Sequence, residues 1–198
     1  VQMQSGDNSG TRWRATYTPS VDEDVSVVSF SVDRLEDPAG NIVSPSSPFT
    51  SDETVNGSMV RIDVEKPDIG NILIVSSNPN SGFAKAGDNL TLSFTTSEVV
   101  RNPLDYLNIQ GVGPIDLSTS DNGTNWIATA QVLDNAIGTP SLSLEVLDQA
   151  GNRGSPYTDN FSHITLDTSP PTLSGLSFVS SNLPDNASIY AKAQDNLT

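Results

Sequence analysis

The chain contains no cysteine, which excludes disulfide bonds and thiolate metal sites. It has one histidine, His163, so a transition-metal site built on several imidazoles and a Cys–His nucleophile pair are excluded as well. No G-x-S-x-G nucleophile elbow is present, which argues against a Ser–His–Asp hydrolase. Acidic residues are numerous enough to supply a glycosidase carboxylate pair, but aromatic residues, which line sugar-binding clefts, make up only 6% of the chain. We therefore expect no enzymatic activity.

Positive charge is also scarce, with 9 Lys and Arg against 24 Asp and Glu and a net charge of −15. Such a chain repels phosphate backbones and anionic lipid surfaces, so we expect no nucleic-acid partner. No apolar run reaches the length of a membrane span, so we expect no membrane insertion in this segment. The acidity has two interpretations, solubility or the binding of a hard divalent cation such as Ca²⁺.

What the chain does contain is a turn-rich, β-forming composition, with 14 Gly and 13 Pro distributed among Ser, Thr, Asn and Asp. Alternating apolar residues predict six short strands, at 71–77, 88–96, 104–110, 122–132, 141–148 and 161–167. The pair Asn122-Gly123 predicts a tight turn. This number of short strands in about 100 residues is typical of an immunoglobulin-like β-sandwich with Trp126 in its core.

Parts of the sequence occur twice, about 104 to 113 residues apart. The octet AKAGDNLT is repeated near the end of the chain as AKAQDNLT, and further matches place Trp13 opposite Trp126 and Asp37 opposite Asp148. The matched segments are 84–91 with 191–198, 5–20 with 118–133, 35–41 with 146–152, and 72–80 with 176–184. Because the two tryptophans occupy equivalent strand positions, we expect both to lie in a core rather than to form a ligand platform.

The repeat predicts three segments. Residues 67–168 form a complete unit, residues 1–66 correspond to the C-terminal part of a unit, and residues 169–198 correspond to its N-terminal part. Joined together, the two end segments lack the counterpart of residues 92–113, so we interpret the chain as an excerpt of a longer array. An incomplete unit leaves sheet edges and core residues without partners. If the end segments are ordered, we therefore expect something else to cover these edges and core residues.

The middle unit combines a Gly87-Asp88 start of a Thr-rich strand, Ser97-Glu98 after that strand, Trp126, the turn DQAGN at 148–152 and the linker DTSPP at 167–171. This series resembles the bacterial Ig-like (Big-type) tandem repeats of large secreted surface proteins and adhesins. The first junction, DVEKPDIGN, departs from the linker pattern. The resemblance implies tandem Ig-like β-sandwich domains at the cell surface or outside the cell. Such repeats would form a non-catalytic stalk or filament whose partners are neighbouring repeats and, in a filament, other copies.

The two Asp-x-Ala-Gly-Asn turns have two interpretations. In the structural one, Asp caps its own turn and Gly takes a positive φ angle. In the functional one, each turn joins a linker carboxylate to form an oxygen cage for Ca²⁺ between domains, although no compact EF-hand-type string supports it. The candidate ligands are Asp37, Asn41, Glu65, Asp148, Asn152 and Asp167.

Two other functions remain as alternatives. The loops at one end of the sandwich could bind a carbohydrate or a protein receptor, and an insertion at Asp185–Tyr190 is consistent with variable binding loops. The segment could instead be an accessory region of a secreted hydrolase whose catalytic domain lies elsewhere. The acidic run Asp22–Asp24 corresponds in the middle unit to LDNAI at 133–137, which has a single carboxylate, so a site there would not be common to every repeat, and we interpret the run as a solvated loop.

Overall fold

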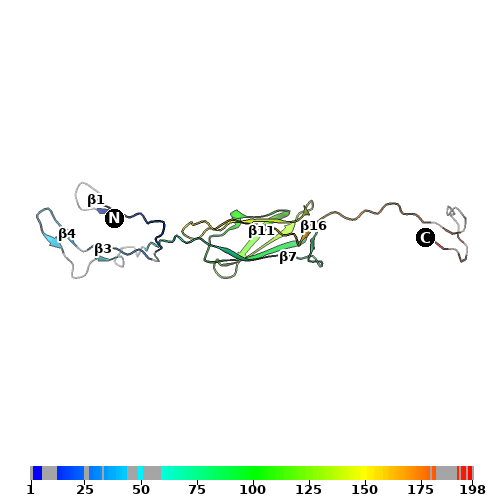
Figure 1. Cartoon of the computed structure of the whole chain (residues 1–198), viewed down its shortest axis with the longest axis horizontal. Coiled ribbons are helices and arrows are strands. Elements are labelled where there is room, and N and C mark those ends of the chain that lie inside the picture. Colours follow the sequence, from blue (N-terminus) through cyan, green and yellow to red (C-terminus); the bar gives the residue numbers. More distant parts are fainter. Residues whose placement is uncertain are drawn as a thin grey trace. The chain divides into compact units, whose positions relative to one another are not determined.

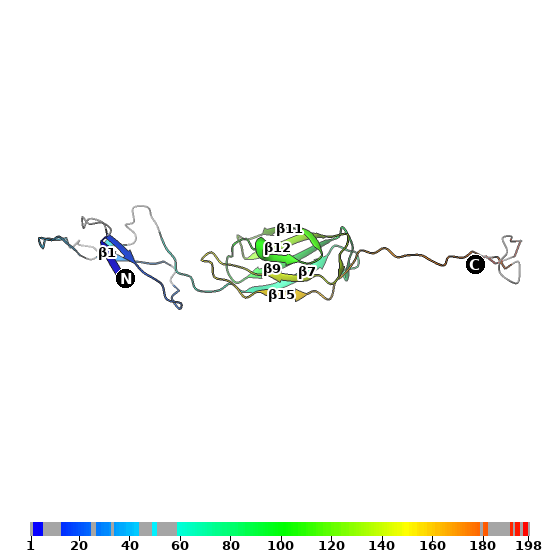
Figure 2. The same ribbon diagram turned by 90° about the horizontal axis from the view of Figure 1, so that it is seen from above.

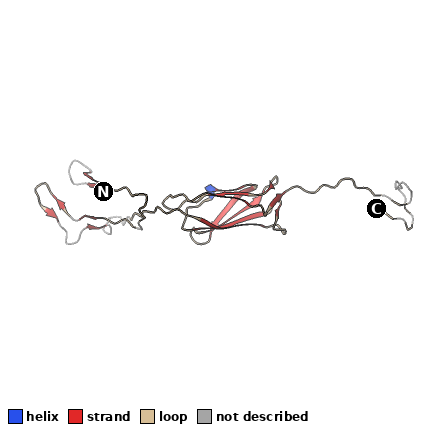
Figure 3. Ribbon diagram, viewed as in Figure 1, coloured by secondary structure: helices blue, strands red, loops and turns tan. Residues whose placement is uncertain are grey.

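The computed structural model is built almost entirely of β-strands in the part of the chain that it describes (Figure 1 and Figure 3). A short 3-10 helix, η2 at Leu104–Tyr106, is the one helical element among the described residues. The expected all-β class is therefore confirmed. The described residues are 2–5, 13–24, 27–32, 34–43, 49–50, 59–178, 180–181, 191, 193–194 and 196–197.

The chain divides into two compact units, Val1–Asp167 and Thr168–Thr198. Most of the regular structure of the first unit lies between Ile69 and Asp167, and we call this stretch the central module. Within the described residues, no helix has the length and apolar character needed to cross a membrane.

The larger sheet of the central module has four antiparallel strands in the order β11-β12-β9-β7 (Figure 2). These strands are β7 (Ile69–Ser76), β9 (Asn89–Thr96), β11 (Val112–Thr119) and β12 (Asn125–Val132). Buried and more exposed residues alternate strictly along both β9 and β12, as the period of two requires of a sheet with one face on the core.

The second sheet of the central module has the order β10-β14-β15 and is also antiparallel. Its strands are β10 (Leu107–Ile109), β14 (Ser141–Leu144) and β15 (Tyr157–Asn160). A small third sheet has the order β13-β16-β8, in which β16 and β8 are parallel. Its strands are β8 (Phe83–Ala84), β13 (Ile137–Gly138) and β16 (Thr165–Asp167).

Residues from both larger sheets meet in one hydrophobic core. Leu90, Leu92 and Phe94 of β9 are almost completely buried, as are Leu142 and Leu144 of β14. Trp126 of β12 is 5% exposed, and its ring stacks on that of Phe94 with 6.3 Å between the centroids. An aromatic pair in this offset arrangement adds about 1 kcal/mol to the effect of its buried area. The expectation that Trp126 anchors a core is confirmed.

The boundaries of several expected strands were wrong. The predicted strand at 104–110 begins with η2, and only residues 107–109 are β10. The predicted strand at 141–148 ends at Leu144, and residues 161–164 form the turn between β15 and β16. The strands β11 and β15 were not predicted at all. Their exposed or polar residues, and Pro114 in β11, hide the period of two.

The described residues of the N-terminal region, which precedes the central module, form three two-stranded sheets, β1-β2, β3-β6 and β4-β5. The strands are β1 (Gln2–Ser5), β2 (Trp13–Thr16), β3 (Ser31–Val32), β4 (Leu35–Glu36), β5 (Ile42–Val43) and β6 (Phe49–Thr50). Trp13 is 58% exposed, so the expectation that it lies in a core like Trp126 is wrong. The physical reason is that, among the described residues, β2 pairs with β1 alone and no second sheet packs over it.

The second unit contains a short bridge that resembles part of the central module. Ser180 pairs with Leu197, as Ser76 pairs with Leu90. The backbone N–H of Ser181 donates to the Asn196 carbonyl oxygen at 3.0 Å, and the N–H of Asn196 donates to the hydroxyl of Ser181 at 3.0 Å. Ser77 and Asn89 form the same two hydrogen bonds, both at 2.9 Å. Asn196 and Leu197 of the repeated octet therefore make the same backbone contacts as Asn89 and Leu90.

A candidate metal centre where the linker meets the central module

The segment that leads into the central module is fixed to it by a buried residue and hydrogen bonds. Pro67 is almost completely buried. The N–H of Asp68 donates to the hydroxyl of Ser97 at 2.9 Å, and the N–H of Ser97 donates to the Asp68 carbonyl at 3.0 Å. These contacts place residues 63–68, which we call the linker, beside the end of β9 and next to the turn that follows β14.

That turn is organised by Asp148, whose side chain is completely buried. Its Oδ1 accepts hydrogen bonds from the N–H groups of Gly151 and Asn152, at 2.5 and 2.8 Å. Its Oδ2 accepts one from the side-chain amide of Asn152 at 2.6 Å. Gly151 has a φ of +103°, a conformation that favours glycine. The structural interpretation of this turn, with Asp as cap and Gly at positive φ, is therefore confirmed.

Asn152 also connects the turn to the linker. Its side-chain amide donates to the backbone carbonyl of Asp63 at 2.9 Å. The N–H of Glu65 in turn donates to Oδ1 of Asp63 at 3.2 Å, which holds the Asp63 carboxylate in this region. The linker, the Asp148 turn and the end of β9 therefore form one hydrogen-bonded end of the module.

At this end three carboxylates lie together. One oxygen from each of Asp63, Glu98 and Asp148 lies within 4.8 Å of the others. Ca²⁺ holds its oxygen ligands at about 2.3–2.6 Å, so two oxygens on one ion lie at most about 5 Å apart, and this group satisfies that limit. We call Asp63, Glu98 and Asp148 the acidic cluster.

The electrostatics of the acidic cluster are unfavourable in the absence of a cation. Partial burial raises the pKa of Glu98, and the charges of Asp63, Asp148 and Glu65 raise it further. A raised pKa means that ionised Glu98 is less stable here than in water. A hard divalent cation would remove both the repulsion and the lost solvation, because its ligands of choice are carboxylate and carbonyl oxygens.

The six ligands expected from the sequence are distributed over three places. Asp148 and Asn152 lie at the acidic cluster, and Glu65 lies beside it in the linker. Asp167 lies at the end of β16, where it pairs with Ile137 of β13. This part of the module is near the start of β9, whereas Glu98 follows the end of β9. Asp167 is therefore at the opposite end of the central module from Asp148.

Asp37 and Asn41 form the remaining turn, between β4 and β5. Oδ1 of Asp37 accepts from the N–H of Asn41 at 2.8 Å, and Oδ2 accepts from its side-chain amide at 2.7 Å. These hydrogen bonds lower the pKa of Asp37. The geometry matches that of the Asp148 turn, but Asp37 is exposed. Asp37 is not part of the metal-compatible group found among the described residues.

Two members of the acidic cluster, Asp63 and Glu98, were not among the ligands expected from the sequence. Glu98 belongs to the Ser-Glu pair that follows the Thr-rich strand, a visible signal that was used only as a family motif. Asp63 lies two residues before Glu65 in the linker, and in an extended segment residues i and i+2 point to the same side. The sequence indicated the correct linker but not which of its carboxylates faces the turn.

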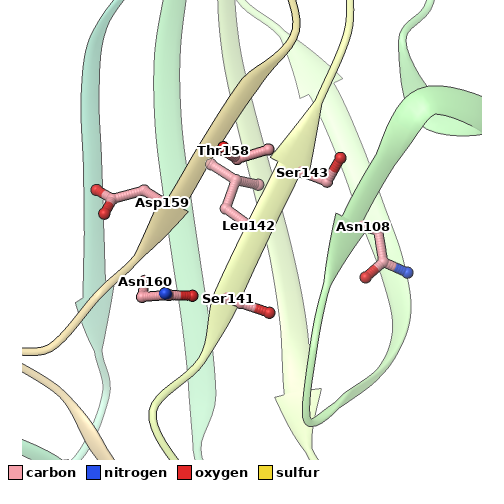
Figure 4. A pocket seen from close by; sticks show the side chains of 7 residues that line it. All are labelled: Asn108, Ser141, Leu142, Ser143, Thr158, Asp159 and Asn160. Carbon is pink, nitrogen blue, oxygen red and sulfur yellow. The ribbon is translucent and has the colours of Figure 1, made fainter.

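A polar hollow of about 520 Å³ lies elsewhere, over β10, β14 and β15 (Figure 4). Six of its seven lining residues are polar, and none is aromatic. The lining residues are Asn108, Ser141, Leu142, Ser143, Thr158, Asp159 and Asn160. The hollow therefore provides hydrogen-bonding groups but no ring on which a sugar could stack.

The only histidine of the sequence lies in the turn between β15 and β16. Nε2 of His163 is 3.4 Å from the carbonyl oxygen of Ile74, and its ring meets Phe161 edge-on. The insertion at 185–190, which the sequence offered as a variable binding loop, lies outside the described residues. Comparison with family models, curated proteins and solved structures found no match to this chain.

Proposed function

We propose that this chain is a non-catalytic structural segment of a large extracellular surface protein. Its units are Ig-like β-sandwiches joined in tandem as a stalk or filament, and Ca²⁺ at the acidic cluster fixes a linker to the module that follows it. The observation that carries the proposal is the docked linker itself, because Asp63 on the linker meets Glu98 and Asp148 on the module within 4.8 Å.

The tandem arrangement is supported by local geometries that occur twice. The Asp37 turn and the Asp148 turn have the same hydrogen bonds between the aspartate and the asparagine four residues later, and the Ser181–Asn196 contact repeats the Ser77–Asn89 contact. Matched geometry at matched sequence positions is expected of repeated units that fold alike. The Ig-like form is supported by short antiparallel strands in two sheets around one core that contains a tryptophan.

A cation at the acidic cluster would stiffen the array by a simple mechanism. Without the ion, repulsion among the three carboxylates favours release of the linker from the module. With the ion bound, the linker oxygen of Asp63 and the module oxygens of Glu98 and Asp148 share one charge, so release of the linker requires release of the ion. Because Ca²⁺ would bind only the docked form of the linker, a higher calcium concentration would stabilise that form and stiffen the linker.

Trypsin gives a direct test, because Arg61 is exposed immediately before the docked segment. We expect 2 mM CaCl2 to slow cleavage after Arg61 at least about fivefold relative to EGTA, since cleavage requires local release of the chain. Cleavage after Arg34, in the N-terminal region, serves as the internal control and should not change. Mass spectrometry of the fragments over time provides the two rates.

Matched variants identify the site. Glu98→Gln and Asp63→Asn should remove the calcium effect at Arg61, whereas Asp167→Asn, at the opposite end of the module, should retain it. Equal cleavage after Arg61 with calcium and with EGTA in the unaltered chain would overturn the proposal that Ca²⁺ holds the linker on the module, which we call the calcium clamp. Protection by MgCl2 as strong as that by CaCl2 would contradict the assignment to calcium.

A further inference from the structure

The N-terminal region contains a hairpin that matches one in the central module. β1 and β2 pair antiparallel with Ser5 opposite Trp13, and β11 and β12 pair antiparallel with Thr119 opposite Trp126. The sequence alignment equates the same two tryptophans. Both hairpins are therefore antiparallel, with the aligned tryptophan on the second strand. Their registers differ by one residue, because the alignment equates Ser5 with Ser118, whereas Trp126 pairs with Thr119.

The two hairpins differ in what lies on the far edge of the tryptophan strand. In the central module β9 pairs with β12 on that edge, so that Trp126 lies opposite Phe94, Ala128 opposite Leu92 and Ala130 opposite Leu90. Among the described residues, β2 pairs with β1 only. The positions that correspond to this covered face are Trp13 and Ala15 in β2 and Tyr17 just after it.

An apolar groove of about 760 Å³ lies along these residues. Its aromatic members Trp13, Tyr17 and Phe30 are 58%, 48% and 51% exposed. The lining residues are Trp13, Ala15, Thr16, Tyr17, Glu23, Val28, Ser29, Phe30, Val32 and Ile62. An apolar groove lined by exposed aromatic side chains, next to a strand that is paired on one edge only among the described residues, is characteristic of a site for another chain segment.

We propose that β2 and this groove form an acceptor site for one antiparallel β-strand of the β9 type. Such a strand alternates Leu and Phe with Ser and Thr, as in NLTLSFTT at Asn89–Thr96. Its backbone would continue the β1-β2 sheet, and its apolar side chains would enter the groove as Leu90, Leu92 and Phe94 enter the core against β12. This is strand addition at a sheet edge, in which main-chain hydrogen bonds supply affinity and alternate side chains supply specificity.

The charge of the chain favours this occupant over a random segment. The net charge of −15 disfavours an acidic partner, and the eight residues of β9 carry no charge. A second copy of the chain is a poorer source, because Leu90, Leu92 and Phe94 of its own β9 are buried in its central module. The inference shares with the proposed function the equivalence of the repeated segments, but it requires neither calcium nor an extracellular location.

A synthetic peptide of residues 87–97, GDNLTLSFTTS, added to the full chain tests the site. The peptide contains no tryptophan, so the intrinsic fluorescence reports the protein alone. We expect saturable binding together with a blue shift and at least a threefold decrease in acrylamide quenching of the exposed component. Trp13→Phe should remove that component, since Trp126 is already buried.

Two variants on one strand locate the peptide. Ala15→Asp places a charge in the groove and should weaken binding of fluorescein-labelled peptide at least tenfold. Arg14→Asp changes the charge on the neighbouring residue, which does not line the groove, and should change binding less than threefold. A peptide with Leu92 and Phe94 replaced by Ser should not bind.

Three results would overturn the proposal. The first is no binding of the 87–97 peptide up to about 1 mM, the range of the weakest specific complexes. The second is equal binding by the Ala15→Asp and Arg14→Asp chains, which would place the peptide elsewhere, for example at the central module. The third is a dimer in sedimentation that Ala15→Asp abolishes, which would make a second copy the occupant of the groove. The calcium clamp is tested by cleavage after Arg61 and the strand-acceptor site by binding of the peptide, so either proposal can fail without the other.

Discussion

Trp13 and Trp126 occupy aligned sequence positions on the second strand of two antiparallel β-hairpins, yet one is 58% exposed and the other 5%. The sequence around them is alike, so local propensity does not account for the difference. What differs is the number of strands and sheets around each hairpin, since β12 lies between β11 and β9 and faces a second sheet, whereas β2 pairs with β1 only among the described residues. A tryptophan in a strand becomes a core residue only when non-local partners cover it.

The same contrast applies to the Asp turns. Asp37 and Asp148 have nearly identical hydrogen bonds to the asparagine four residues later. Asp148 is nevertheless buried and adjacent to two other carboxylates, whereas Asp37 is exposed. A turn motif therefore specifies its own backbone, and the surrounding fold determines whether the motif can take part in a cation site.

The largest effect is expected from truncation of the two tryptophans. Trp126→Ala should reduce the free energy of unfolding of the central module by about 3–5 kcal/mol, because it leaves a cavity beside Phe94. Trp13→Ala should change the same free energy by less than about 1 kcal/mol, as exposed positions generally do. Urea denaturation followed by circular dichroism measures both. Equal losses in the two variants would contradict the claim that the two surroundings differ.

The second effect concerns the two turn aspartates. Asp148→Ala removes an acceptor of three hydrogen bonds in a buried place and should cost about 1.5–3 kcal/mol of unfolding free energy, the range for hydrogen bonds to a charged group. Asp37→Ala should leave the unfolding of the central module unchanged, since its turn is solvated. The check is the urea midpoint of each variant at pH 7 in EGTA. A larger loss for Asp37→Ala would be inconsistent with the exposure of its turn.

The parts of the fold that the sequence predicted are those determined by local pattern. The strict alternation of Leu90, Leu92 and Phe94 predicted β9 to within one residue. Positive φ angles at Asn122 and Gly123 agree with the predicted tight turn. The edge strand β11 was missed because Pro114 breaks its pattern. The register shift between Val112 and Ile115 accommodates this proline, and only the partner strand reveals it.

The sequence predicted the residues of the candidate site that belong to the Asp148 turn, but not its other members. Asp148 and Asn152 are close in sequence and follow a recognisable motif, so local reasoning found them. Asp63 and Glu98 are 35 residues apart and meet only because Pro67 is buried and the linker pairs with Ser97. Contacts of that kind depend on tertiary packing, which one sequence does not specify through periodicity.

A smaller effect is expected at the two turn glycines. Gly40 and Gly151 have φ angles of +86° and +103°, a region in which a Cβ atom costs about 1–2 kcal/mol. Gly151→Ala should lower the stability of the central module by that amount, because the turn is part of its hydrogen-bonded end. Gly40→Ala strains a turn outside the module and should not shift its midpoint. Hydrogen exchange at Asn152 and Asn41 distinguishes local strain from global loss, and an unchanged midpoint for Gly151→Ala would show that the turn relaxes freely.

The smallest effect, and the one most closely tied to the clamp, is the pH dependence from Glu98. Because the pKa of Glu98 is raised in the folded state, the unfolded chain gives up this proton at lower pH than the folded chain. In EGTA, stability should therefore fall as the pH rises from the ordinary glutamate value of 4.5 through the raised one. Glu98→Gln has no such proton to lose, so its melting temperature at pH 7 should exceed that of the unaltered chain by on the order of 2 °C in EGTA. In calcium the order should reverse, since only the unaltered chain keeps all three carboxylates for the ion. If Glu98→Gln melts lower in both buffers, the carboxylate stabilises the fold by itself, and repulsion in the acidic cluster is not what calcium would relieve.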